Sequence, residues 1–186
     1  MSKIIFFDID GTLYDSRIGI PESTVNALNQ LIANEHKIVM CTGRSKGMIP
    51  EEYFHMGFDG VILGAGTYVE YEGKILHQEL MTPEEVQTVI DWGKKQKIGI
   101  ILEGEKHGYY DPENTDDYYI AMKNKTEADC KTILYPLNEA VDVPKWTYHH
   151  MELAKKPEIE ELLGHKYKGT YHEPVNSVEF VPLGVN

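Results

Sequence analysis

The sequence is poor in cysteine, with only Cys41 and Cys130 among 186 residues. Two cysteines cannot build the disulfide framework of a small secreted domain, so we expect two ordinary reduced thiols, as in a cytoplasmic protein. Long hydrophobic runs are also missing. The apolar stretch at residues 4–7 is far shorter than a signal-peptide core, and no segment approaches the roughly 20 apolar residues of a membrane span. We therefore expect a cytoplasmic chain with no membrane partner.

Positive charge is scarce as well. The chain has 18 Lys and Arg residues against 30 Asp and Glu residues, which gives a formal net charge of −12. A chain of this charge has no basic tail or face to follow a nucleic-acid backbone, so nucleic acid is not an expected partner. A site for a phosphorylated ligand must instead create its own positive potential, from a metal ion, backbone N–H groups or a placed cation.

The first 80 residues alternate between strand and helix patterns. Short apolar runs, each typical of a parallel strand buried on both faces, occupy residues 3–7, 37–41 and 61–63. Pro21 opens a helical pattern that places Val25, Leu28 and Ile32 on one side. A second helical stretch precedes the third run. This β-α-β-α-β order favours a parallel sheet with right-handed crossovers, in the Rossmann style.

The pattern changes after a predicted hairpin at residues 68–78. Thr82-Pro83-Glu84-Glu85 has the form of a capping box, with proline at the first helical position. Beyond it we predict strands at residues 98–102, 106–110, 167–171 and 175–181, and a helix from Pro157 that buries Ile159, Leu162 and Leu163 and ends at Gly164. Residues 111–117 predict an acidic loop, and the segment up to residue 150 has no clear pattern. We therefore predict two domains, residues 1–80 and residues 81–186, the second of α+β type.

The clearest chemical signal is Asp8-Ile9-Asp10-Gly11-Thr12-Leu13, directly after the first predicted strand. Asp8 can attack phosphorus, and Asp10 can protonate the leaving oxygen and then deprotonate water. Gly11 and Thr12 turn the chain so that backbone N–H groups can surround phosphate oxygens. A Mg²⁺ ion at Asp8 and Asp10 would neutralise charge and align the attack.

Two other interpretations of this hexapeptide are weaker. A turn with merely solvated carboxylates is common for an isolated Asp-x-Asp, but rare for one followed by Gly-Thr-Leu at the end of a buried strand. The metal-binding Asp-x-Asp of nucleotide-sugar glycosyltransferases does not call for Gly-Thr-Leu, and it normally follows a nucleotide-binding unit.

A second signal, Thr42-Gly43-Arg44, follows the second predicted strand. The carboxyl ends of neighbouring parallel strands meet at one crevice, where such sheets bind ligands. The Thr42 hydroxyl would hold a phosphoryl oxygen there, with the Gly43 backbone and the Arg44 side chain beside it. A helix N-cap at Thr42 is the alternative explanation.

Together the two motifs resemble the first and second motifs of the haloacid dehalogenase (HAD) superfamily. Thr-Gly-Arg, followed by an α/β unit after the third strand and its hairpin, resembles the Cof-type sugar-phosphatase branch. The resemblance implies an α/β, Rossmann-like parallel-sheet core with an α+β cap domain that selects the substrate. It also implies a Mg²⁺-dependent phosphatase that hydrolyses a small phosphorylated metabolite through an aspartyl-phosphate on Asp8. Gly64-Ala65-Gly66 departs from the Asn-Gly-Ala that is frequent in the branch.

The resemblance further implies a C-terminally truncated chain with an incomplete core. In Cof-type proteins a stretch like residues 178–186 leads into the lysine of a third motif, and an acidic fourth motif follows it; the sequence contains neither. We therefore expect weak Mg²⁺ binding, little or no hydrolysis by this chain alone, and self-association through an uncovered first-strand edge. A non-catalytic fragment that binds phosphate or a partner, and a phosphosugar mutase, are the alternatives.

Several aromatic and histidine residues are lesser candidates. His149 and His150 are adjacent and so do not share one face of a strand or helix, which argues against a metal-ligand pair. His107, Tyr109 and Tyr110 could line a substrate pocket. We favour packing for the two tyrosines and an exposed position for His107.

Overall fold

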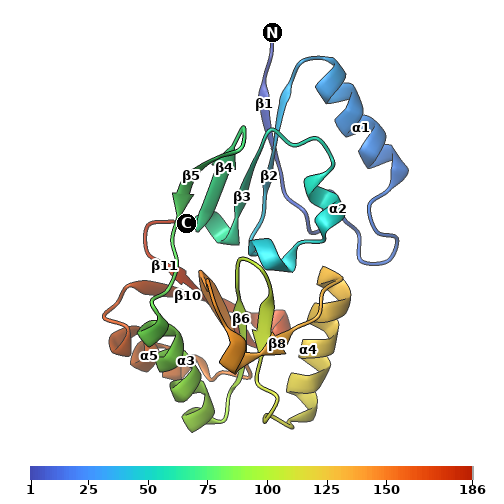
Figure 1. Ribbon diagram of the computed structural model, residues 1–186. Coiled ribbons are helices and arrows are strands. Elements are labelled where there is room, and N and C mark those ends of the chain that lie inside the picture. The colour runs from blue at the N-terminus through green and yellow to red at the C-terminus, as the bar shows by residue number, and fades with distance from the viewer. Residues whose placement is uncertain (186) are drawn as a thin grey trace.

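A computed structural model describes residues 1–185, and its strands form two sheets, one above the other in Figure 1. The upper sheet has the strand order β1-β2-β3-β4-β5, and the lower one β10-β11-β9-β6-β7-β8. Helices α1 and α2 accompany the upper sheet, and α3, α4 and α5 accompany the lower one. Among the described residues no helix has the length and apolar character needed to cross a membrane.

The upper sheet has the predicted Rossmann-like order. Its elements are β1 (Ile4–Phe7), α1 (Glu22–Ala33), β2 (Lys37–Cys41), α2 (Glu51–Phe54), β3 (Gly60–Leu63), β4 (Tyr68–Tyr71) and β5 (Lys74–Gln78). Strands β1, β2 and β3 are parallel, and β4 and β5 add the predicted antiparallel hairpin. The α/β class is therefore confirmed.

Strand β1 lies at the edge of the upper sheet, and within residues 1–185 it pairs only with β2. Ile4 and Phe6 are each 58% exposed, so the prediction of a strand buried on both faces is wrong, while the expected uncovered edge is present. The predicted stripe on α1 is also only partly buried, because Leu28 is covered but Val25 and Ile32 are exposed. The face of β1 that carries Ile4 and Phe6 thus has little cover.

The lower sheet contains the rest of the regular structure. Its elements are α3 (Pro83–Gln96), β6 (Gly99–Glu103), β7 (Gly108–Tyr110), α4 (Asp117–Cys130), β8 (Tyr135–Pro136), β9 (Lys145–His149), α5 (Lys156–Leu162), β10 (Tyr167–His172) and β11 (Ser177–Pro182). The capping box at Thr82 is confirmed. The sequence did not predict α4, β8 or β9, and Leu162, predicted to be buried, is 56% exposed.

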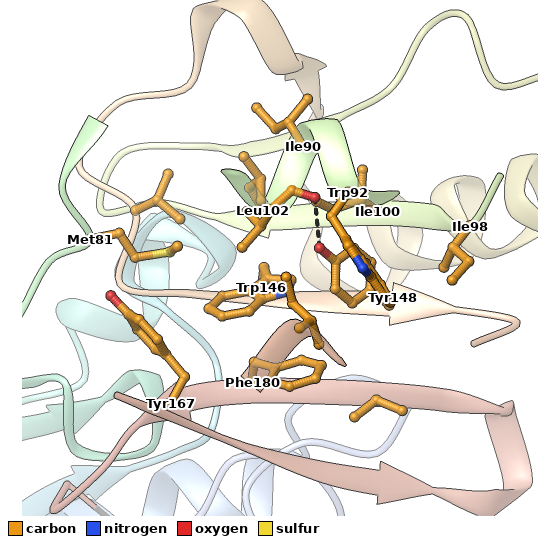
Figure 2. Packing of buried hydrophobic residues seen from close by; sticks show 14 of the residues in the cluster. Met81, Ile90, Trp92, Ile98, Ile100, Leu102, Trp146, Tyr148, Tyr167 and Phe180 are labelled. Atoms are coloured by element: carbon orange, nitrogen blue, oxygen red, sulfur yellow. Dashed lines mark hydrogen bonds between the residues drawn. The ribbon is translucent and has the colours of Figure 1, made fainter. Parts of the chain in front are cut away.

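One face of the lower sheet carries an aromatic core, shown in Figure 2. Trp146 and Phe180 stack with centroids 4.8 Å apart, and the buried Tyr148 hydroxyl donates to the Val89 carbonyl at 2.6 Å. Alternate residues of a strand point to opposite faces, so the neighbours of these core residues on β6, β9 and β11 point the other way. That second face looks toward α4 and the upper sheet.

The two sheets meet where the chain after β2 touches the lower sheet. Met48, from the 3-10 turn Lys46–Met48, packs with Ile101 and Tyr119. The Gly47 amide donates to the Gly104 carbonyl at 3.1 Å. A Cβ atom at Gly47 would lie 2.3 Å from the backbone nitrogen of His107. Only glycine allows the two backbones to approach this closely.

Candidate active site

Asp8 and Thr42 lie at the ends of neighbouring strands. Strands β1 and β2 are paired in parallel with Phe7 opposite Met40, so the register continues with Asp8 beside Cys41. Burial raises the pKa of the Cys41 thiol, and the charge of Asp8 adds to that effect. Asp8 is exposed and Thr42 is 5% exposed, so the predicted nucleophile and the predicted phosphate-holding hydroxyl share the carboxyl edge of the sheet.

The turn after β1 is closed by its own backbone. The Ile9 carbonyl accepts the amides of Thr12, Leu13 and Tyr14 at 2.8–3.2 Å. The Gly11 amide donates to the Tyr14 carbonyl at 2.9 Å, and Gly11 has φ +79°, which favours glycine. The Gly11 and Thr12 amides are therefore paired inside the turn in this structure. The side chains of Asp8, Asp10 and Thr12 remain exposed.

Arg44 holds the Asp10 carboxylate with two hydrogen bonds. Its Nε donates to Asp10 Oδ2 at 2.8 Å, and its Nη2 donates to Oδ1 at 2.5 Å. Its third nitrogen, Nη1, donates to the Asp129 carbonyl in α4 at 3.1 Å. Burial works against the charge of Arg44, but the contact with Asp10 outweighs it and raises the pKa of the guanidinium. The planar fork fixes the orientation of the Asp10 carboxylate and ties it to α4.

The loop that contains Thr42, Gly43 and Arg44 is held by backbone contacts. The Thr42 Oγ1 accepts the Arg44 amide at 3.2 Å, and the Arg44 carbonyl accepts the Gly64 amide at 2.8 Å. The next helical turn begins at Lys46, so Thr42 is not a helix N-cap. Because its oxygen accepts the amide, the Thr42 hydroxyl hydrogen remains available for an acceptor such as a phosphoryl oxygen.

Residues of the lower sheet also reach this loop. Lys145 on β9 donates to the Gly43 carbonyl at 2.6 Å, and Glu103 on β6 accepts the Ser45 amide at 3.3 Å. Neither residue was predicted, nor was the Asp129 carbonyl that Arg44 contacts. For Lys145, the available signal in the sequence was a charged residue directly before Trp146, at the start of a strand.

A cleft of about 380 Å³ opens over Asp10. It is lined by Asp10, Gly11, Tyr14, Arg17, Lys125 and Asp129, among others. It therefore brings the turn after β1 together with α4. A larger cleft of about 1050 Å³ opens between the sheets near Lys46, His107 and Lys131, but its lining does not include Asp8 or Asp10.

The oxygen donors at this edge suit Mg²⁺ in kind but are few. Mg²⁺ prefers oxygen ligands and is usually bound through one or two carboxylates plus waters and substrate phosphate. The Asp8 carboxylate and the exposed Asp10 are donors of that type. Within residues 1–185, however, no three acidic, histidine or cysteine side chains form a group that could hold a metal. The residues present therefore fit a partial Mg²⁺ site.

The aromatic residues of β7 serve mainly in packing, as predicted. Tyr109 is 1% exposed and its hydroxyl donates to the Val141 carbonyl at 3.3 Å. His107 is half-buried and packs on Tyr135, with centroids 4.3 Å apart, so the expectation that it is exposed is wrong. The Lys123 Nζ lies over the Tyr110 ring, 4.9 Å from the ring centroid.

A family model described as haloacid dehalogenase-like hydrolase matches residues 5–186. The Bacillus subtilis protein YkrA is 28% identical over 104 residues, which are 56% of this chain and 40% of that protein. The HMP-PP phosphatase of Yersinia enterocolitica is 29% identical over an alignment that covers 100% of this chain and 69% of that protein. A solved haloacid dehalogenase-like hydrolase from Bacteroides thetaiotaomicron is 17% identical, with a TM-score of 0.79 over 100% of this chain and 73% of that one. The chain thus spans less than half the length of YkrA.

Proposed function

Because the chain belongs to the haloacid dehalogenase-like hydrolases, within the Cof type, we propose that it carries the phosphoryl-transfer site of a Mg²⁺-dependent phosphatase. One observation carries this proposal. Asp8 and Thr42 lie at adjacent strand ends, and Arg44 orients the Asp10 carboxylate two residues beyond Asp8. The proposed substrate is a small phosphorylated metabolite.

In the first step of the proposed reaction, an Asp8 carboxylate oxygen attacks phosphorus. A bond from that oxygen to phosphorus forms, the ester P–O bond breaks, and the leaving oxygen takes the proton of the Asp10 carboxylic acid. In the second step Asp10, now a carboxylate, takes a proton from water as the water oxygen attacks phosphorus. The bond to Asp8 breaks, and inorganic phosphate and the free Asp8 carboxylate result.

The other residues of the site bind and orient the substrate. The Thr42 hydroxyl donates to a phosphoryl oxygen, and Gly43 lets the loop approach the phosphate closely. Arg44 holds the Asp10 carboxylate through both of its oxygens, so Asp10 must leave the guanidinium to carry the proton of the first step. The turn at Gly11 and Thr12 places both aspartates on the same edge. Mg²⁺, held by Asp8 and Asp10, would neutralise charge between carboxylate and phosphate. With so few protein ligands, we propose that it is held weakly and that this chain alone hydrolyses little or nothing.

The hydrolysis of p-nitrophenyl phosphate by the pure chain tests this function. We expect little or no hydrolysis, and any Mg²⁺-dependent rate that is measured should disappear in Asp8→Asn, because an amide does not replace the carboxylate nucleophile. The matched control is Asp91→Asn, which makes the same change at an exposed position of α3 and should keep the rate. A Mg²⁺-dependent rate that survives in the folded Asp8→Asn variant would contradict the proposal.

We also propose that residues 1–80 form the core and that residues 81–186 form the cap that selects the substrate. Support comes from the hydrogen bonds at the junction. The Glu79 amide donates to the Thr67 carbonyl, beside the upper sheet. The Met81 amide donates to the Val143 carbonyl, beside the lower sheet. The cleft over Asp10 takes residues from both sides of this junction, as a substrate-selecting cap requires.

A second copy of the chain is a further proposed partner. Strand β1 offers an open backbone edge, and Ile4 and Phe6 on it are each 58% exposed. Such an edge pairs readily with another strand unless charge or proline blocks it. We propose that the chain self-associates through β1, in a cytoplasmic setting.

A further inference from the structure

Lys145 is the most deeply buried charged residue described. It lies at the start of β9, on the face of the lower sheet that looks toward the upper sheet, and is 2% exposed. Its Nζ contacts carboxylates on two neighbouring strands, Glu103 on β6 at 3.3 Å and Glu179 on β11. A buried ammonium needs such partners, because its desolvation is costly.

The charges of this cluster favour an ionised Lys145. Burial alone would lower the pKa of the ammonium, but the two carboxylates outweigh it and raise the pKa. Burial raises the pKa of Glu103, whereas Lys145 and His172 hold the pKa of Glu179 below its usual value in spite of burial. The cluster therefore presents a charged donor, with a fixed position, at the boundary between the sheets.

The third partner of Lys145 belongs to the loop after β2, in the upper sheet. Its Nζ donates to the Gly43 carbonyl at 2.6 Å, across 102 positions of sequence. Two residues further along the same loop, the Ser45 amide donates to Glu103 at 3.3 Å. Both contacts join the lower sheet to the backbone of one short loop, between the predicted phosphate-holding Thr42 and the 3-10 turn at Lys46.

The Gly43–Arg44 peptide group links the Lys145 contact to Thr42. In a trans peptide the C=O and the following N–H point in opposite directions, and no cis peptide occurs in the described chain. When Lys145 holds the Gly43 carbonyl, the Arg44 N–H must point the other way, where it donates to Thr42 Oγ1 at 3.2 Å. That bond occupies a lone pair of the hydroxyl and directs its hydrogen toward another acceptor.

We infer that Lys145 is a positioning residue, which sets the Thr42 hydroxyl for phosphate binding by fixing the Gly43–Arg44 peptide from the other sheet. The inference rests on the proposed function, since it assigns Thr42 to phosphate. It adds a residue of the lower sheet, outside both sequence motifs, to the determinants of the phosphate site. Glu103 and Glu179 hold Lys145 in place and complete the unit.

The variant Lys145→Met tests this inference, because methionine keeps the apolar stem and removes the ammonium. Hydrogen exchange of the Arg44 amide should become about tenfold faster, the size expected for the loss of one charged hydrogen bond. The Thr42 amide, which donates to Ile62 in the sheet, should exchange at the unchanged rate. The ¹³C signal of the Gly43 carbonyl should move upfield as its donor is lost.

Phosphate binding is the functional measurement. In the presence of Mg²⁺, the affinity for inorganic phosphate should fall about tenfold in Lys145→Met. It should be unchanged in Lys168→Met, the same substitution at an exposed lysine of β10. If Lys145→Met does not fold, because two buried carboxylates lose their partner, Lys145→Met with Glu179→Gln carries less unpaired charge and replaces it.

The outcomes separate this inference from the proposed function. An unchanged Arg44 exchange rate and Gly43 signal in a folded variant would overturn the positioning role, and so would unchanged phosphate affinity beside a changed exchange rate. A wild-type chain that binds no phosphate would count against the proposed function alone. In that case the exchange rate and the carbonyl signal still decide whether Lys145 orients the peptide.

Discussion

Two side chains, Arg44 and Lys145, connect the lower sheet to the edge of the upper sheet that holds Asp8 and Thr42. Arg44 spans from Asp10 to the Asp129 carbonyl, and Lys145 reaches Gly43. Both are charged and largely buried, so each contact acts in a low-dielectric environment where a missing partner is costly. The orientation of Asp10 and Thr42 therefore depends on residues that make no proposed contact with the substrate.

His149 gives the lower sheet a measurable pH dependence. Burial, with a smaller contribution from His150, lowers the pKa of His149 to about 4 from an ordinary value of 6.5. A lowered pKa means that the unfolded chain binds the proton first, so stability is complete above pH 6.5 and falls as the pH drops toward 4. The loss should be on the order of 3 kcal/mol.

The variant His149→Phe should remove that contribution. Between pH 6.5 and 4 its unfolding free energy, measured by urea denaturation, should fall less than that of the wild type. His165→Phe, at an exposed position with φ +53°, should give a curve parallel to that of the wild type. Parallel curves for His149→Phe and the wild type would show that His149 is not buried in its neutral form.

At the level of elements, the capping box stabilises the N-terminus of α3 through two hydrogen bonds. The Thr82 side chain accepts the Glu85 amide at 3.2 Å, and Glu85 accepts the Thr82 amide at 2.9 Å. Thr82→Ala should lower the unfolding free energy by about 1 kcal/mol, read from urea denaturation. Thr88→Ala, inside the same helix, should be neutral or slightly stabilising, because alanine is the better helix former. Equal losses in the two variants would contradict the capping role.

Elements defined by local pattern could be predicted, and those that depend on packing could not. The strand at residues 37–41 and the capping box at Thr82 follow from a few adjacent residues. Helix α4 was missed because Tyr118, Tyr119 and Ile120 are adjacent instead of spaced three or four apart, and the rest of the helix is largely polar.

Part of the candidate site could likewise be predicted from the sequence, and part of it could not. The two motifs predicted that Asp8, Asp10 and Thr42 would gather at one edge, because the carboxyl ends of parallel strands do so. The contacts of Lys145, Glu103 and Asp129 could not be predicted, since they depend on how the lower sheet packs on the loop after β2. Burial at β1 was overestimated because an apolar run does not reveal whether its strand is central or at an edge.

For the molecule as a whole, the exposed edge of β1 predicts association. Light scattering should show a mass above that of the monomer that rises with concentration, and Phe6→Lys should restore the monomer, because charge on an edge strand blocks pairing. Ile75→Lys places the same charge at the opposite edge, on β5, where Ile75 is 57% exposed. It should leave association intact. A wild type that stays monomeric at high concentration would contradict this account.

The most direct test of the central claim is whether Asp8 accepts a phosphoryl analogue. With Mg²⁺ and beryllium fluoride, ¹⁹F NMR of the wild-type chain should show a bound trifluoroberyllate signal. The signal should be lost without Mg²⁺ and in Asp8→Asn, and should persist in Asp91→Asn. A bound signal that survives in Asp8→Asn, or its absence from the folded wild type at saturating Mg²⁺, would contradict the assignment of Asp8 as the nucleophile.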